Sequence, residues 1–186
     1  MFKPILGPLN NSLPLARAQV NFFAPARPGK PTLSATMSRS LVHREIQILD
    51  HDVDKVWSIV SEFANVIDWA PSVSACTTEG RGIGAVRTVV ESGFSFQEKL
   101  EVLDPVAHII SYRIVDPTPF PMRGFFGTIH LDGEREGQTR LTWTADAESI
   151  DNSGLAVVGP VMDSFIQRSI RGLRAVLDGK PKDYER

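Results

Sequence analysis

The hydrophobic spacing of the chain changes at Asn152, and this change limits the folds that it can adopt. From Asn152 to Gly179, apolar side chains recur every three or four residues, which is the spacing of an amphipathic helix. Between Leu41 and Ser149, most segments instead alternate apolar and polar residues and are separated by short turns. A series of short strands that ends in one long helix predicts a domain of the α+β class.

The segment Phe94–Asp104 has the clearest alternation in the chain. One of its rows is entirely polar, so we expect that row to face water. The row expected to face the interior is Phe96, Glu98, Leu100 and Val102. Glu98 is therefore the one charged side chain in an otherwise apolar inner row.

Seven strands and three helical segments are expected after the first forty residues. The strands are Leu41–Leu49, Ser72–Thr78, Ala85–Ser92, Phe94–Asp104, His108–Asp116, Arg123–Glu134 and Thr139–Ser149. A helix is expected at Val53–Phe63, and a short helical turn after it ends at Pro71. Hairpin-length connections make the sheet antiparallel. The pattern predicts a helix-grip fold: a curved seven-stranded antiparallel sheet wrapped around the long C-terminal helix, with two short helices after the first strand.

The long helix is expected to bury one stripe and to contain a break. The stripe is Val158, Met162, Phe165, Ile166, Ser169, Leu173 and Val176. Arg168, Arg171 and Arg174 lie mainly away from it. Gly159 and Pro160 should kink the helix or mark its true start, which would leave residues 153–159 as a mobile lead-in.

Composition and charge argue against several classes of function. The net charge of −2 gives no electrostatic footprint for nucleic acid, and no run approaches the roughly 18 apolar residues of a transmembrane helix, so we expect a soluble protein. Cys76 is the single cysteine, which rules out an internal disulfide and suits a reducing, intracellular compartment. The four histidines lack metal-ligand spacing and no phosphate-binding glycine motif is present, so we expect no metal and no cofactor.

The first forty residues differ from the rest of the chain. Residues 1–44 contain no acidic residue, and six prolines fall between Pro4 and Pro31. Such a segment is either a disordered extension or an organelle transit peptide, and Met37 is an alternative start. We therefore expect residues 1–40 to be an extension, 41–179 to be the folded domain and 180–186 to be a disordered tail. The localisation is then cytoplasmic, or mitochondrial or plastid if residues 1–40 are a transit peptide.

Three stretches of sequence carry a resemblance to a known family. They are VDKVWSIVSEFANVIDWAPSV, GIGAVRTVVESG followed by EKLEVLDPVAHIISYRIV, and SFIQRSIRGLRAVL. Over Leu41–Leu177 the chain resembles the START-like superfamily (SRPBCC), which includes polyketide cyclase/dehydrase proteins, birch pollen allergens and lipid-transfer domains. The resemblance implies an internal cavity for an apolar ligand.

Within that superfamily, the chain is most similar to members like the abscisic-acid receptors. Their gate sequence Ser-Gly-Leu-Pro-Ala corresponds to the segment that starts at Ser92 and Gly93, where only Ser-Gly is kept. Their latch sequence does not match at Pro121–Arg123, and their ligand-pairing lysine is replaced at about Ser74. Glu98 and Tyr112 match a pocket glutamate and a pocket aromatic residue of these proteins.

The candidate ligand site follows from the expected inner faces and the resemblance. Its residues are Thr88, Val90, Phe96, Glu98, Leu100, Tyr112, Ile114, Arg123, Phe125, Trp143, Phe165 and Ser169. Glu98 is expected to bind the ligand, to act as an acid/base catalyst, or to be a carboxylate at the pocket mouth that is either solvated or paired with Arg123. Arg87 is placed on the polar face of its strand in a structural role, and Trp57 and Trp69 in helix-to-sheet packing.

Two main functions remain open on the sequence alone. The first is binding or transport of a small hydrophobic or amphipathic molecule such as a lipid, isoprenoid or polyketide. The alternative is a polyketide cyclase or dehydratase that uses Glu98, with Tyr112 or Arg123, to move protons. A protein-interaction module that responds to the filled pocket is a third possibility, and the oligomeric state is left open.

Overall fold

A computed structural model describes residues 38–183, and the expected order of elements is confirmed. The strands are β1 (Ser40–Leu49), β2 (Val73–Glu79), β3 (Val86–Glu91), β4 (Phe94–Asp104), β5 (Ile109–Ile114), β6 (Phe126–Arg135) and β7 (Gln138–Ala147). The helices are α1 (Val53–Val60), the 3₁₀ helix η1 (Phe63–Asp68) and α2 (Asn152–Leu177). Residues 1–37 of the extension predicted at 1–40, and residues 184–186 of the tail predicted at 180–186, lie outside the described residues.

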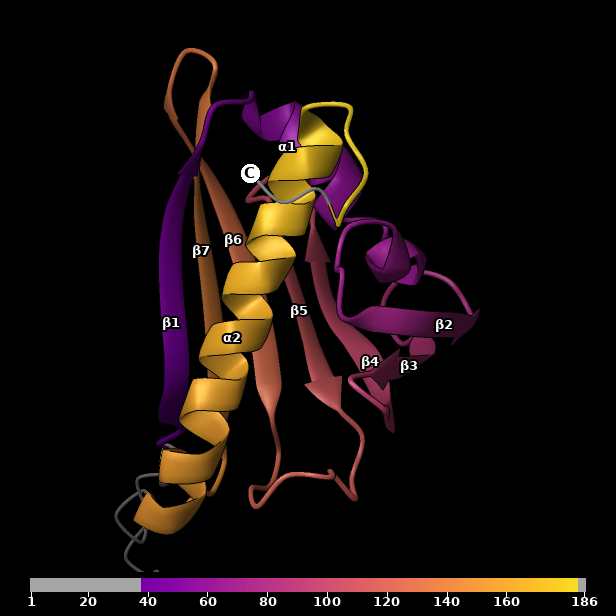
Figure 1. Ribbon diagram of the computed structural model, residues 1–186, viewed down its shortest axis with the longest axis vertical. Coiled ribbons are helices and arrows are strands. Elements are labelled where there is room, and N and C mark those ends of the chain that lie inside the picture. The colour runs from indigo at the N-terminus through magenta and orange to yellow at the C-terminus, as the bar shows by residue number, and fades with distance from the viewer. Residues whose placement is uncertain (1–37, 184–186) are drawn as a thin grey trace, which may run out of the picture. The chain divides into compact units, whose positions relative to one another are not determined.

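All seven strands form one antiparallel sheet in the order β1-β7-β6-β5-β4-β3-β2. Figure 1 shows α2 in front of this sheet, beside β1, β7 and β6, while β2 and β3 run crosswise at the far end. The helix-grip architecture expected from the sequence is therefore confirmed. None of the helices within residues 38–183 is long and apolar enough to cross a membrane.

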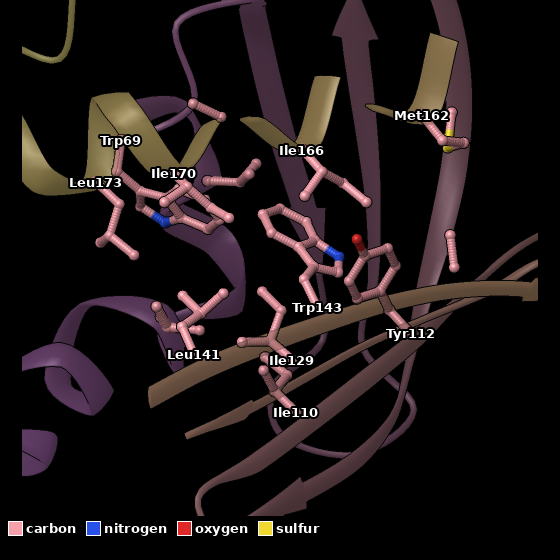
Figure 2. Packing of buried hydrophobic residues seen from close by; sticks show 14 of the residues in the cluster. Trp69, Ile110, Tyr112, Ile129, Leu141, Trp143, Met162, Ile166, Ile170 and Leu173 are labelled. Atoms are coloured by element: carbon pink, nitrogen blue, oxygen red, sulfur yellow. The ribbon is translucent and has the colours of Figure 1, made fainter. Parts of the chain in front are cut away.

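The core lies between α2 and the concave face of the sheet. Trp143 from β7, Tyr112 from β5 and Trp69 from the turn after η1 meet Ile166 and Ile170 of α2 there (Figure 2). The inward row of β7 alternates strictly with half-buried residues, as its apolar pattern predicts.

One glycine lets α2 lie close to the turn that follows η1. A Cβ atom at Gly172 would lie 2.3 Å from the carbonyl oxygen of Trp69 and 2.7 Å from Cδ of Pro71. No larger residue fits at this position without moving the backbone, so Gly172 fixes the C-terminal half of α2 against the rest of the domain.

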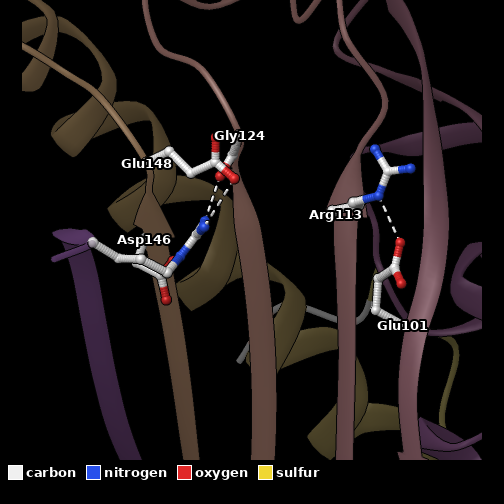
Figure 3. A network of polar contacts seen from close by, with 6 residues as sticks. Glu101, Arg113, Gly124, Asp146 and Glu148 are labelled. Atoms are coloured by element: carbon white, nitrogen blue, oxygen red, sulfur yellow. Dashed lines mark hydrogen bonds and ion pairs between the residues drawn. The ribbon is translucent and has the colours of Figure 1, made fainter. Parts of the chain in front are cut away.

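A polar network covers part of the outer surface (Figure 3). The guanidinium of Arg39 bonds Asp146 and the carbonyl oxygen of Gly124, and Arg113 Nε donates to Glu101 Oε1 at 2.5 Å. These contacts bridge neighbouring strands at positions that face water, which fits the polar outward rows predicted from the sequence.

Two expectations about individual elements are wrong. The pairing of β4 with β5 shifts by one residue between Leu100 and Val102, so Val102 is exposed and Leu103 packs against the core instead. Pro160 also does not mark the start of the long helix after a lead-in at residues 153–159, because α2 begins at Asn152 and Pro160 lies inside it. Asp151 caps this helix by accepting the amide N–H of Gly154 at 2.7 Å.

Candidate ligand site

An ion pair between Arg87 and Glu98 lies in the apolar interior. Arg87 on β3 and Glu98 on β4 are directly paired residues, so their side chains project from the same face of the sheet. Nε of Arg87 donates a hydrogen bond to Oε2 of Glu98 at 2.6 Å, and Nη2 forms an ion-pair contact with the same oxygen at 2.6 Å; the two side chains are only 7% and 8% exposed. Charges this deeply buried are tolerated because each compensates the other.

Further contacts hold the Arg87 guanidinium in place. Its Nη1 donates to the carbonyl oxygen of Phe63 at 2.6 Å, which ties the sheet to η1. The guanidinium carbon lies 4.1 Å from the centre of the Phe63 ring and 5.3 Å from that of Tyr112. Both distances are in the range of cation–π attraction.

Tyr112 brings a phenol hydroxyl into the same region. It is paired with Gly127 on β6, where a Cβ atom would lie 2.4 Å from Cζ of the tyrosine ring, so only glycine leaves room for the phenol. Burial raises the pKa of Tyr112, and the negative charge of Glu98 raises it further, while Arg87 opposes the shift. The hydroxyl therefore keeps its proton at neutral pH, with the Trp143 indole beside it (Figure 2).

A small cavity separates these groups from α2. Its lining is Val60, Val66, Trp69, Arg87, Ile110, Tyr112, Ile129, Trp143 and Phe165, and its volume is about 10 Å³. The Trp143 ring centre lies 5.8 Å from that of Phe165 and 5.9 Å from that of Trp69, so aromatic side chains pack closely around this cavity. A space of this size holds about one water molecule.

A surface groove of about 280 Å³ opens on the other side of Phe165. It runs between the β3–β4 turn and α2, and its lining is Glu91, Ser92, Pro160, Val161, Ser164, Phe165 and Arg168. The half-buried Phe165 side chain lines both the groove and the internal cavity. Phe165 is thus the side chain that lies between the cavity and the surface.

Comparison with known families agrees with this arrangement. Residues 40–178 match the family described as polyketide cyclase / dehydrase and lipid transport. The chain belongs to this family. The resemblance stated from the sequence is therefore confirmed, and members of the family bind small hydrophobic ligands.

One curated relative is a plant hormone receptor. The chain is 37% identical to abscisic acid receptor PYL6 of Arabidopsis thaliana over 78 residues, which cover 38% of this chain. It spans about a third of the receptor's length, with 36% covered.

Two solved structures share the fold at low sequence identity. A solution structure from Thermobifida fusca superimposes with a TM-score of 0.66 at 21% identity, covering 77% of this chain and 95% of the other. The ZhuI aromatase/cyclase from Streptomyces sp. R1128 gives 0.57 at 18%, covering 74% and 91%.

The structure places most of the residues of the predicted ligand site in the interior. Tyr112, Trp143 and Phe165 line the cavity directly. The remaining residues that are buried or half-buried within the domain are Phe96, Glu98, Leu100, Ile114, Phe125 and Ser169. Phe96 packs edge-to-face on Phe120, which lies in the loop between β5 and β6, and the two ring centres are 6.4 Å apart.

Three expected site residues do not point into the interior. Thr88 and Val90 are paired with Gln97 and Ser95, on the opposite face of the sheet from the Arg87–Glu98 pair. Thr88 and Val90 alternate with the buried residues of β3, so the face of β3 that was expected to point inward in fact points outward. Arg123 is exposed, and among the described residues only its backbone forms hydrogen bonds, with Ser149 and Glu148, so it is not the partner of Glu98.

Sequence reasoning missed several residues that line the cavity. They are Val60, Val66, Trp69, Arg87, Ile110 and Ile129. Arg87 is the most consequential, because it was placed on the polar face and is instead the buried partner of Glu98. Trp69 both packs against Trp143 and lines the cavity, so its role exceeds helix-to-sheet packing.

Other potentially reactive groups lie away from the cavity. Burial raises the pKa of the Cys76 thiol, which disfavours the thiolate and does not suit a nucleophile. Within residues 38–183, one group of three possible metal ligands, His43, Glu45 and Asp163, has donor atoms within 4.8 Å of one another. Two of its separations, from His43 Nε2 to the carboxylates, are 3.6 and 3.7 Å. That the protein needs no metal stays a prediction.

Proposed function

We propose that this protein binds and carries a small hydrophobic or amphipathic molecule, such as a lipid, isoprenoid or polyketide, between the sheet and α2. The observation that carries the proposal is the position of Phe165, which lies between a surface groove and an aromatic-lined interior. The interior offers apolar contact area, and its one charged pair is internally compensated.

Binding requires the interior to open. Ligand pockets generally have about 300–1,000 Å³, whereas the cavity here has about 10 Å³ and the adjoining groove about 280 Å³. Displacement of Phe165 joins these two spaces, and the ligand then replaces the contacts that Phe165 makes with Trp143. The closed form protects the aromatic interior from water until a ligand takes its place.

The test begins with the full chain purified without denaturant. Native mass spectrometry is expected to show a bound apolar molecule in at least part of the sample. A panel of fatty acids, isoprenoid alcohols and aromatic polyketides is then added, and tryptophan fluorescence and thermal unfolding are followed. Trp69 and Trp143 both line the cavity, so a bound ligand changes their emission.

A matched pair of variants locates the binding. Ile129→Phe fills the cavity and should weaken binding, while Ile46→Phe makes the same change at an exposed position of β1 and should not. An empty protein that no member of the panel stabilises would contradict the proposal. If Ile129→Phe and Ile46→Phe changed ligand affinity equally, the ligand would not bind in the cavity.

The second candidate function is a cyclase or dehydratase acting on a polyketide-like substrate. It is favoured by the cavity-facing Tyr112 hydroxyl, a protonated donor, with the Glu98 carboxylate behind Arg87. Glu98 itself does not line the cavity, and its Oε2 is already held by Nε and Nη2 of Arg87, so proton transfer through this oxygen would first require Arg87 to move. Carriage is therefore the better supported function.

Glu98→Gln separates the two candidates. For an enzyme, this variant loses turnover of a substrate that it still binds, because an amide cannot accept the proton. A variant that keeps full turnover of such a substrate contradicts an acid/base role for Glu98.

A further inference from the structure

The outer surface of α2 carries a stripe that changes from apolar to cationic along the helix. Val157 and Val161 are 61% and 42% exposed, and Ser164, Arg168 and Arg171 continue the same face at helical spacing. Val161, Ser164 and Arg168 also line the groove above Phe165. The apolar-to-cationic gradient thus passes along the entrance to the interior.

A second groove continues from the first at the C-terminal end of α2. It has a volume of about 430 Å³, and Arg168 lines both grooves. Its lining is Pro71, Arg168, Arg171, Gly172, Arg174, Ala175, Asp178, Lys180, Lys182 and Asp183. Five of these side chains are cationic and two are anionic, although the whole chain carries a net charge of −2.

Most of the positive charge in this second groove is not neutralised. Arg174 bonds the Gln47 side chain and the carbonyl oxygen of Ile48, and Lys182 bonds backbone carbonyls, so their partners are uncharged. Within the described part of the chain, Arg168 contacts only Ser164 Oγ at 3.5 Å, and Arg171 has no hydrogen-bond or ion-pair partner. Both arginines are exposed and available to an anion.

The interior offers no comparable charge. Its arginine, Arg87, is already paired with Glu98, so an anionic group placed there would lose its hydration without gaining a free cation. The favourable positions for the two ends of an amphipathic molecule are therefore different: the apolar end fits inside and the anionic end fits at Arg168 and Arg171.

We propose that the protein binds a single-chain amphipathic anion, whose apolar chain enters past Phe165 while its phosphate or carboxylate head binds Arg168 and Arg171. This inference rests on the proposed carrier function and names the class of its ligand.

Glu91 determines on which side of the entrance the head lies. This buried carboxylate lines the groove above Phe165 and accepts a hydrogen bond from the Ser92 hydroxyl at 2.8 Å. It repels a neighbouring anion, so the head lies toward Arg171 and away from the β3–β4 turn. Glu91→Gln is therefore expected to tighten binding of an anionic ligand about two- to fivefold, the range for one partly screened charge.

The experiment compares dodecyl phosphate, dodecanol and inorganic phosphate on the full chain by titration calorimetry, below micellar concentrations. Dodecyl phosphate is expected to bind more tightly than dodecanol and to lose affinity as NaCl is added. The double variant Arg168→Gln/Arg171→Gln should raise the Kd for dodecyl phosphate about tenfold and leave that for dodecanol within about twofold. Arg44→Gln removes an arginine from an exposed position of β1 that is paired with Thr144 on the outer face, and should change neither Kd.

The outcomes distinguish this inference from the function on which it rests. If wild-type protein binds dodecanol and dodecyl phosphate equally, or if the double variant weakens both alike, the assigned head position is wrong. If inorganic phosphate binds as tightly as dodecyl phosphate, the groove is a free-phosphate site and the amphipathic ligand is ruled out. If neither dodecyl ligand binds and the wider panel also fails, the carrier function itself fails.

Discussion

Two nitrogens of Arg87 meet the same oxygen of Glu98: Nε donates a hydrogen bond to Oε2 at 2.6 Å, and Nη2 lies 2.6 Å from it in the same ion pair. This pair joins β3 to β4, and the third nitrogen of the guanidinium extends the connection to the Phe63 carbonyl of η1. The Arg87 guanidinium therefore ties β3 and β4 to η1, whose Val66 lines the cavity.

Removing one partner of this pair should be costly. Arg87→Met leaves the Glu98 carboxylate buried without a counter-charge, and we expect the free energy of unfolding to fall by about 3–5 kcal/mol. The double variant Arg87→Met/Glu98→Leu removes both charges and should recover most of this loss. Urea unfolding of both variants and of Glu98→Leu alone measures the coupling. A double variant no more stable than Arg87→Met would show that the charges are not the cause.

Replacing Gly127 should destabilise the sheet through Tyr112. The Cβ atom of Gly127→Ala would meet Cζ of the phenol ring at 2.4 Å, and forcing such a contact typically costs about 1–3 kcal/mol. Tyr112→Leu removes the clashing ring, so Gly127→Ala should cost less in that background than in the wild type. Gly133→Ala is the control, because a Cβ atom there meets nothing within 4 Å. Additive effects of Gly127→Ala and Tyr112→Leu would contradict the clash.

Acid should weaken the start of α2. Hydrogen bonds from the Gly154 amide and the Ser153 side chain lower the pKa of Asp151 below its usual value of 3.8. A carboxyl whose pKa is lower in the folded state stabilises the fold above its unfolded-state pKa, and this contribution disappears as the pH falls through the folded-state pKa. Urea unfolding between pH 6 and pH 2.5 should therefore show a loss of stability below about pH 4. Asp151→Asn should make that loss smaller, and an unchanged pH profile would argue against the cap.

Truncation of Phe165 should open the interior. Phe165→Ala joins the cavity to the surface groove, so ligands should associate faster, as stopped-flow tryptophan fluorescence can measure. The loss of stability should stay below the about 3–5 kcal/mol typical of a fully buried phenylalanine, because Phe165 is half-buried. Phe94→Ala, at the exposed first position of β4 beside the β3–β4 turn, is the control for aromatic truncation near the entrance. An unchanged association rate in Phe165→Ala would show that ligands enter elsewhere.

The order of strands and the long helix were predictable because their hydrophobic periods differ. The inner face of β3 was not found, since Val86, Thr88 and Val90 look more apolar than Arg87, Val89 and Glu91, which actually face inward. The turn at Ser92 and Gly93 would have identified the inner face of β3, because its length fixes which residues of β3 and β4 are paired. Both residues have positive φ angles, as in a two-residue hairpin turn, which pairs Glu91 with Phe94 and hence Arg87 with Glu98.

Other features of the site were beyond sequence reasoning for physical reasons. The register shift after Leu100 exposes Val102, and a one-residue shift leaves no mark in an alternating sequence. The volume of the cavity depends on how Trp69, Trp143 and Phe165 pack together from distant parts of the chain, and a sequence pattern does not contain that packing.

The close contact at Gly172 makes this residue the point about which the N-terminal part of α2 would tilt. Its C-terminal half is held against the Trp69 carbonyl, whereas near the other end Pro160 lacks the N–H that would bond the carbonyl of Ala156. Pro160 lies about 18 Å along the helix from Gly172, at about 1.5 Å per residue. A tilt of only about 10° around Gly172 would thus carry Pro160 about 3 Å away from the sheet. Phe165 is seven residues from Gly172, so the same tilt would move its part of the helix about 2 Å away from the sheet, in the direction that opens the interior.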